Sequence, residues 1–299
     1  MKRLAAILGA AVCLAACSGS PSAPAPVAGG GGEIPPTVTA TPAATLVGAG
    51  DIGECGQGSA RTAELLDRIA GTVFTTGDNA YPSGTWADFQ NCYEPSWGRH
   101  RARTRPTPGN HDYYTPNAAP YYQYFGANAG PAGLGYYSYA LGPWHIVALN
   151  SEIDARSGSA QEQWLRADLA DNPTRCTAVY WHRALYSSGN HGGDAKMLEI
   201  WRTLYDLNVD LVITGHDHLY ERFAPQDRTG KMDLTRGIRQ FVVGTGGGGL
   251  FPVGALRPNS EVTASTWGVL AFTLEGDRYR WRFISVDGVF HDEGVTSCH

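Results

Sequence analysis

Short hydrophobic runs recur along the chain from residue 46 onward, and several end at a glycine followed by a charged residue. Runs of this length that are rich in β-branched residues are typical of buried strands. The clearest example is Val209 to Ile213, which precedes Gly215, His216 and His218. Other runs of this kind are Leu46 to Ala49, Val73 to Thr76, Tyr136 to Tyr139, Trp144 to Leu149, Thr177 to Trp181, Phe241 to Val243, Val269 to Leu274 and Tyr279 to Val286.

Helical patterns alternate with these strands. Ser59 to Ala70 has apolar residues at helical spacing, with Ser59 as the expected N-cap. Ser159 and Glu162 form a capping-box pattern, and Asp194 precedes a helical pattern that ends near Leu207. Alternation of strands and helices predicts an α/β fold with parallel strands. Residues 85–108 show neither period, so we expect irregular structure there.

The first residues have the pattern of an export signal. Lys2 and Arg3 precede an apolar run from Leu4 to Leu14, which is too short to span a bilayer. The following Leu-Ala-Ala-Cys resembles a bacterial lipobox, which implies cleavage after residue 16 and a lipid on Cys17. We expect an extracytoplasmic protein that is held to the membrane only through this lipid, or is secreted.

Three segments are therefore expected. Residues 1–16 are the lipoprotein signal peptide, and residues 17–45 are a disordered tether of Pro, Gly, Ala and Ser that lacks the apolar surface needed to fold. Residues 46–299 form the folded domain. Its oligomeric state is left open by the sequence.

Charge and cysteine content narrow the possible functions. The formal net charge is -5 and no basic stripe is present, which argues against a nucleic-acid partner. Besides Cys13 and Cys17, four cysteines remain, and an even number in an exported chain predicts two disulfides. Three pairings are possible, and we favour Cys55 with Cys92 and Cys176 with Cys298. None of these cysteines has the CxxC spacing of a zinc or redox site.

Candidate metal ligands follow the expected strands. In an open α/β sheet, ligands bind where the carboxyl ends of strands meet. A His-x-His pair alone could be an ordinary polar loop, but aspartates follow two other strands. Carboxylate and phenolate suit a hard cation, whereas imidazole and amide oxygen suit a divalent one. Seven groups are too many for one tetrahedral metal, so two metals are indicated: Asp51, Asp78, Tyr81, Asn110, His182, His216 and His218.

Five sequence blocks together resemble the signature of the calcineurin-like metallophosphoesterases. The GDxxY block at residues 77–81 narrows the resemblance to the purple acid phosphatase branch. This resemblance implies a four-layer αββα sandwich of two mixed sheets flanked by helices. The blocks begin at Gly50, Gly77, Gly109, Val179 and Gly215 and read GDIG, GDNAY, GNHD, VYWH and GHDH.

The resemblance also implies an activity and a metal content. Asp51, Asp78, Tyr81 and His218 would hold Fe(III). Asp78, Asn110, His182 and His216 would hold a divalent partner, which is iron, zinc or manganese, with Asp78 bridging. A metal-bound hydroxide would then cleave a phosphate monoester of a small molecule. Cleavage of phosphodiesters or pyrophosphates at the same centre is the alternative, because loops form the leaving-group pocket.

Three further residues are candidates for catalysis. We assign His111 to phosphate charge or leaving-group protonation, with Asp112 orienting its ring. By resemblance His191 contacts substrate, and a solvated loop histidine is the alternative. The plant-type enzymes carry an N-terminal β-sandwich and more histidines near this loop, which this chain lacks. A binding protein on an inactive scaffold would have lost ligands, and all seven are present.

Overall fold

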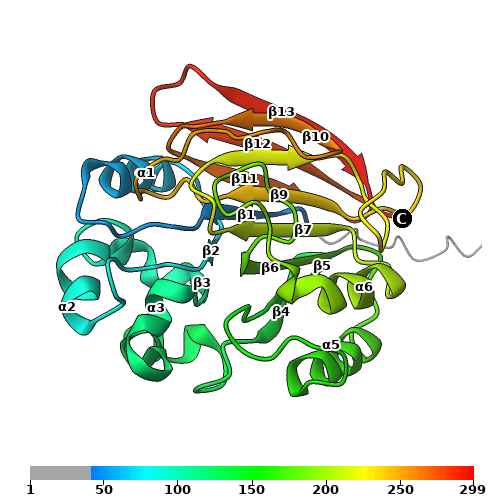
Figure 1. Cartoon of the computed structure of the whole chain (residues 1–299), viewed down its shortest axis with the longest axis horizontal. Helices are drawn as coiled ribbons and strands as arrows, with labels where there is room; N and C mark the ends of the chain where they lie inside the picture. Colours follow the sequence, from blue (N-terminus) through cyan, green and yellow to red (C-terminus); the bar gives the residue numbers. More distant parts are fainter. Residues whose placement is uncertain (1–41) are drawn as a thin grey trace, which may run out of the picture. The chain divides into compact units, whose positions relative to one another are not determined.

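Two mixed β-sheets lie face to face in the computed structural model, which describes residues 42–299, with helices on their outer sides (Figure 1). This arrangement confirms the α/β fold class expected from the sequence. The expected signal peptide, the lipid site at Cys17 and most of the tether fall on residues 1–41, which lie outside the described residues. The first strand begins at Ala44.

The six-stranded sheet has the order β13-β12-β11-β1-β2-β3. Its strands β1, β2 and β3 are parallel, while β11, β12 and β13 add an antiparallel half beside β1. The strands span Ala44–Ala49 (β1), Thr72–Thr76 (β2), Thr104–Thr107 (β3), Gly268–Leu274 (β11), Arg278–Ser285 (β12) and His291–Ser297 (β13).

The seven-stranded sheet has the order β10-β8-β9-β7-β6-β5-β4. Strands β5, β6, β7 and β9 run parallel, and the strands at both edges pair antiparallel. The strands span Tyr137–Leu141 (β4), Trp144–Ala148 (β5), Thr177–Arg183 (β6), Leu211–Gly215 (β7), Tyr220–Phe223 (β8), Arg239–Val243 (β9) and Ser260–Ala264 (β10).

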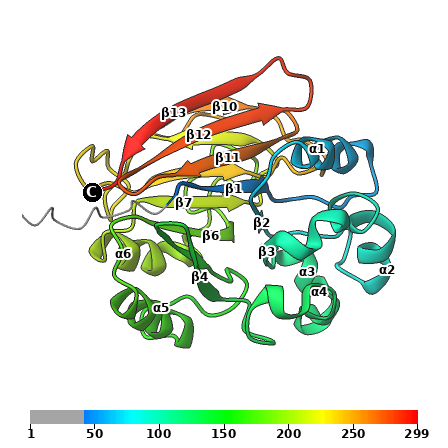
Figure 2. The same cartoon turned by 180° about the vertical axis from the view of Figure 1, so that it is seen from behind.

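Helices flank the sheets and cluster beside β3 (Figures 1 and 2). Helix α1 packs on the six-stranded sheet, while α5 and α6 cover the seven-stranded one. As expected, Ser159 caps α5 by accepting from the Glu162 nitrogen. The expected cap Ser59 lies inside α1, whose N-cap is Gly56. The helices span Gln57–Asp67 (α1), Trp86–Asp88 (α2), Asn110–Tyr114 (α3), Ala119–Phe125 (α4), Ala160–Asp171 (α5) and Leu198–Asp206 (α6).

Alternation along β6 decides which side chains face the space between the sheets. Ala178 and Tyr180 belong to the core between the sheets, whereas Val179 and Trp181 pack under the helices. His182 continues the inward series because successive strand residues point to opposite faces. The strand pattern therefore directs this imidazole toward the other sheet.

The expectation of irregular structure over residues 85–108 is wrong. Thr85 and Asp88 form a capping box that begins the short helix α2. A π-helix (η1, Phe89–Tyr93) and a 3₁₀-helix (η2, Trp97–Arg103) follow, before β3. These elements are too short for a hydrophobic period to show, and burial of side chains such as Trp97 holds them in place.

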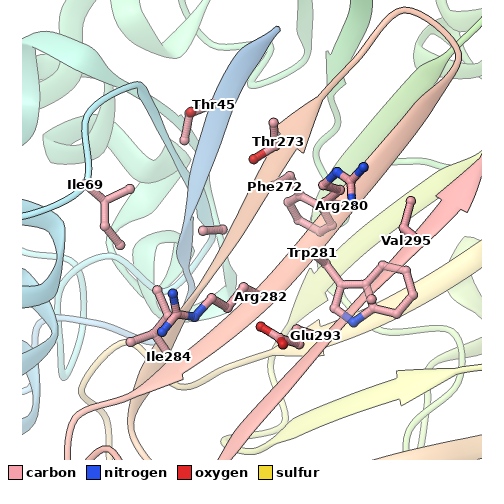
Figure 3. A pocket seen from close by; sticks show the side chains of 12 residues that line it. Thr45, Ile69, Phe272, Thr273, Arg280, Trp281, Arg282, Ile284, Glu293 and Val295 are labelled. Carbon is pink, nitrogen blue, oxygen red and sulfur yellow. The ribbon is translucent and has the colours of Figure 1, made fainter.

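The outer face of β11, β12 and β13 is largely open. Arg280, Arg282 and Glu293 point outward there and line a shallow pocket of about 570 Å³ with Thr45 and Ile69 (Figure 3). Charges of both signs on this face are consistent with contact to water. In the described part of the chain, no helix combines the length and apolar character needed to cross a membrane.

Candidate metal centre

The ends of four strands bring the predicted ligands together. Asp51 follows β1 and Asp78 follows β2 in one sheet, while His182 lies near the end of β6 and His216 and His218 follow β7 in the other. Strand β2 contacts both β6 and β7 across the interface between the sheets. The carboxylates of one sheet therefore face the imidazoles of the other.

The backbone is strained at these strand ends. Asp51, Asp78 and His216 have φ values of 59°, 48° and 72°, which non-glycine residues rarely adopt. Gly77 has a φ of 82°, and a Cβ on it would lie 2.7 Å from ring atoms of His182. Strain of this kind is concentrated at functional sites, where the surrounding structure compensates for its cost.

An oxygen-rich group of ligand atoms surrounds the phenol of Tyr81. Its Oη lies 3.0 Å from Asp51 Oδ1, 3.2 Å from Asp78 Oδ2 and 3.1 Å from His218 Nε2. Burial and the charges of the two carboxylates raise the pKa of Tyr81 well above its usual value. Only a cation close to the phenol would reverse this effect and favour the phenolate.

A nitrogen-rich group lies on the other side of Asp78. His182 Nε2 is 3.3 Å from Asp78 Oδ2, 3.0 Å from Asn110 Oδ1 and 3.1 Å from His216 Nδ1. Ligand atoms of Asp78, His182 and His216 all lie within 4.8 Å of one another, as a metal site requires. Asp78 Oδ2 thus belongs to both groups of ligand atoms.

Backbone groups hold the far atom of each carboxylate. Asp51 Oδ2 accepts a 2.9 Å hydrogen bond from the nitrogen of His216, and Asp78 Oδ1 accepts one of 2.8 Å from the nitrogen of His111. Each carboxylate therefore keeps its other oxygen directed at the ligand groups. Such supporting contacts are characteristic of metal sites.

Two imidazoles are fixed in the same way. His182 Nδ1 lies 2.8 Å from the carbonyl of Thr76, and His218 Nδ1 lies 2.6 Å from that of Gly249. A carbonyl oxygen only accepts, so Nδ1 carries the proton and a neutral ring presents its lone pair at Nε2. In the neutral state both rings would therefore bind a metal through Nε2.

These residues fit a pair of cations. The single proton of Tyr81 cannot satisfy Asp51, Asp78 and His218 at once. The lone pair of a neutral His182 ring would face the oxygen atoms of Asp78 and Asn110. Converging lone pairs repel one another unless a cation lies between them. Carboxylate, phenol, amide and imidazole groups match the ligand chemistry of iron, zinc and manganese.

Charges at the centre are strongly coupled. Burial opposes ionisation of Asp78, but the adjacent His182 outweighs it and lowers the Asp78 pKa well below its usual range. Burial would lower the pKa of His182, yet Asp78 raises it to about 10. Burial and the charge of His182 lower the pKa of His216 to about 2. The buried carboxylate thus requires a positive partner, which a proton supplies when a metal does not.

The expected role of Asp112 is not what the structure shows. The ring of His111 is oriented by the Pro82 carbonyl, 2.6 Å from Nδ1. Asp112 instead accepts through Oδ2 from the Gly109 nitrogen and from the backbone and side chain of Asn79. It is the third residue of α3, so its carboxylate turns back to the helix N-terminus and away from the neighbouring ring.

His191 lies beside the ligand groups. Its ring stacks on that of His216 with centroids 3.9 Å apart, and its Nδ1 is 3.0 Å from Asp217 Oδ1. A cavity of about 300 Å³ is lined by His191, His111, Asn110 and His216. His191 and His111 therefore border the same cavity.

Several residues at this cavity were not singled out from the sequence. Arg183 lines it, with Nη1 3.4 Å from His216 Nε2. Phe251 also lines it and stacks on His218, with ring centroids 4.2 Å apart. The position of Arg183 immediately after His182 was a signal that could have been used, but nothing in the sequence links Phe251 to the centre.

Two disulfides confirm the favoured pairing, Cys55 with Cys92 and Cys176 with Cys298. The first joins the loop after β1 to the π-helix and lines a second cavity of about 470 Å³, which also contacts Tyr81, His111 and His218. This bond therefore borders the space next to the ligand groups. The second connects the start of β6 to the end of the chain.

The two packed sheets, with candidate metal ligands where their strand ends meet, are the arrangement expected of a metallophosphoesterase. The sequence matches the calcineurin-like phosphoesterase family over residues 44–220, and the chain belongs to this family. It is 31% identical over 252 residues to purple acid phosphatase 18 of Arabidopsis thaliana, covering 73% of this chain and 54% of that protein. An uncharacterized protein of Mycobacterium tuberculosis is 30% identical over 224 residues, covering 60% of this chain and 41% of that one.

Solved structures share the fold. Purple acid phosphatase PPD1 from yellow lupin superposes with a TM-score of 0.73 at 20% identity, covering 86% of this chain and 54% of that one. GAP50, described as the anchor in the inner membrane complex of Plasmodium, gives a TM-score of 0.65 at 15% identity. The superposition covers 86% of this chain and 89% of that one. The chain spans about half the length of the curated relatives it matches. The fold by itself does not assign an activity.

Proposed function

We propose that this chain hydrolyses phosphate monoesters of small molecules at a two-metal centre, as a purple acid phosphatase-like enzyme. One observation carries the proposal: Asp78 Oδ2 lies between an oxygen-rich and a nitrogen-rich group of ligand atoms. A bridging carboxylate is the arrangement expected when two cations lie side by side. The similarity to plant purple acid phosphatases supports the same activity.

Two sets of residues would hold the metals. Fe(III) would bind the hard oxygen ligands of Asp51, Asp78 and Tyr81 together with His218. A divalent iron, zinc or manganese ion would bind Asp78, Asn110, His182 and His216. When bound, such a pair lowers the pKa of a water molecule and stabilises negative charge on a phosphate.

The chain's own residues would bind the ester and handle protons. His111 in α3 and His191 in the loop after β6 border the cavity and would donate hydrogen bonds to phosphate oxygens. The Nδ1 atom of His111 is occupied by the Pro82 carbonyl, so Nε2, which lies 3.9 Å from Asp78 Oδ2, is the nitrogen that would contact the substrate. As water forms a bond to phosphorus and the ester P–O bond breaks, protonated His111 would give its Nε2 proton to the leaving oxygen.

The proposal places the enzyme outside the cytoplasm. Two disulfides are typical of exported proteins and support this location. A lipid on Cys17 would hold the domain at the membrane surface. Cys17→Ser should then move the protein from the membrane fraction to the soluble fraction, and an unchanged distribution would contradict lipid anchoring.

Metal analysis and a visible spectrum test the proposed centre. The purified chain should contain two metal equivalents including iron, absorb visible light through phenolate-to-iron charge transfer, and hydrolyse p-nitrophenyl phosphate. Tyr81→Phe should remove the colour, while Tyr114→Phe, at a phenol that lines the cavity outside the oxygen-rich group, should keep it. A colourless protein with one metal would overturn the purple acid phosphatase assignment.

A further inference from the structure

Arg183 brings a guanidinium to the cavity at the end of β6, immediately after His182. Its Nε lies 2.9 Å and 3.1 Å from the two carboxylate oxygens of Glu152. Its Nη1 lies 3.5 Å from Asp194 Oδ2. Glu152 therefore fixes the guanidinium through Nε and leaves N–H groups of the two terminal nitrogens for another acceptor.

His216 presents a second donor at the same place. Its Nδ1 is directed at the nitrogen-rich ligand group, 3.1 Å from His182 Nε2. A neutral imidazole that binds a metal through Nδ1 carries its proton on Nε2. That nitrogen lies 3.4 Å from Arg183 Nη1, so two N–H donors would then face each other. An anionic oxygen beside them would satisfy both.

The cavity is suited to an anion such as phosphate. Arg183, His111 and His191 border it beside the candidate metal ligands Asp78, Asn110, His216 and His218, and its volume of about 300 Å³ accommodates a phosphate group. The guanidinium of Arg183 keeps its charge at every physiological pH. Its charge-assisted hydrogen bonds also impose a fixed direction on the acceptor.

We propose that Arg183 binds a terminal oxygen of the substrate phosphate and thereby favours monoesters over diesters, an inference that rests on the proposed phosphatase function. A monoester dianion has three terminal oxygens and two negative charges. A diester has two terminal oxygens and one charge. A fixed guanidinium in addition to two metals therefore stabilises the bound monoester more than the bound diester.

Paired substrates test this role in the metal-loaded full chain. Arg183→Gln should lower kcat/KM for p-nitrophenyl phosphate by about 10- to 100-fold, the loss expected for a charge-assisted hydrogen bond. Turnover of bis(p-nitrophenyl) phosphate should fall much less. Arg156→Gln is the matched control, because it removes a guanidinium from an exposed pair with Asp154. This control should leave the monoester-to-diester ratio unchanged.

A second variant separates binding from folding. Arg183→Gln leaves the buried end of Glu152 without its partner, so the double variant Glu152→Gln, Arg183→Gln removes both charges together. The double variant should show the same drop in the monoester-to-diester ratio as the single one. A ratio equal to that of the wild type in both variants would overturn the inference, as would equal losses on the two substrates.

Calorimetry with inorganic phosphate gives a readout that does not depend on turnover. The metal-loaded wild-type chain should bind phosphate about 10- to 100-fold more tightly than Arg183→Gln. If the wild type cleaves no phosphoester, the proposed function fails, and this titration still decides whether Arg183 binds phosphate. Equal phosphate affinity in the wild type and the variant would refute the role of Arg183.

Discussion

The Oδ2 atom of Asp51 accepts a 2.9 Å hydrogen bond from the backbone nitrogen of His216, which joins the end of β1 in one sheet to the end of β7 in the other. Both residues have positive φ values, 59° and 72°. The contact leaves Asp51 Oδ1 directed at Tyr81. One buried hydrogen bond therefore both links the two sheets at this edge and orients a candidate metal ligand.

Metal binding should make a measurable contribution to stability through Asp78. Its buried carboxylate is shared by both ligand groups, so cations that bind the folded chain should raise its free energy of unfolding. At a metal concentration 1,000-fold above Kd this gain is about 4 kcal/mol. Thermal unfolding with and without a chelator should show a large drop in Tm for the wild type and almost none for Asp78→Asn. Asp154→Asn, at an exposed carboxylate, should behave as the wild type.

Leaving-group protonation by His111 predicts a dependence on the leaving group. His111→Gln should lower kcat on glycerol phosphate by about 100-fold, because an alkoxide needs a proton as it departs. On p-nitrophenyl phosphate the loss should be much smaller, since nitrophenolate is stable without one. His291→Gln, on the exposed edge strand β13, serves as the control for both substrates. Equal losses on the two substrates would show that His111 binds phosphate charge and gives no proton.

Asp112 should make the metal-free chain less stable as the pH rises. Burial and the charge of Asp78 raise the pKa of Asp112 from its ordinary value of 3.8 to about 7. The folded chain then binds more protons than the unfolded chain between these values, so the free energy of unfolding falls with pH by up to about 1.4 kcal/mol per unit. Asp112→Asn removes this titration.

Urea unfolding of the metal-free chain at several pH values checks the effect. The stability difference between the wild type and Asp112→Asn should shrink, or turn in favour of the variant, as the pH rises from about 4 to 7. The variant should start about 1 kcal/mol less stable at low pH, because its amide nitrogen would occupy the place of Oδ1, which has no hydrogen-bond partner. A difference that is constant with pH would contradict the raised pKa.

Removal of each disulfide should lower the free energy of unfolding of the domain, and the two losses should differ. The Cys55–Cys92 bond separates its cysteines by 37 residues and the Cys176–Cys298 bond by 122. Loop-closure entropy then predicts losses of about 4 and about 5 kcal/mol for the paired Cys→Ser variants. Denaturant unfolding measures both losses. Hydrogen exchange should also detect faster opening of β13 in the variant that lacks Cys176–Cys298, because Cys298 follows that strand.

The sequence by itself located the candidate metal ligands at the ends of strands. Asp51, Asp78 and His216 follow buried apolar strands, and parallel strands bring such positions to one edge of a sheet. Strand period and loop position are local properties, so they are readable from neighbouring residues. The favoured disulfide pairing and the α/β class also agree with the structure.

Only the tertiary structure decided which strands form the sheet edges and which residues support the candidate ligands. Strand β13 shows no clear hydrophobic alternation, because it lies at a sheet edge where polar residues such as His291 and Glu293 remain in water. Asp112 caps its own helix, although it follows His111 in sequence. Arg183 lies against Glu152, a contact across 31 positions. Partners far apart in the chain are chosen by packing, and no local pattern encodes that choice.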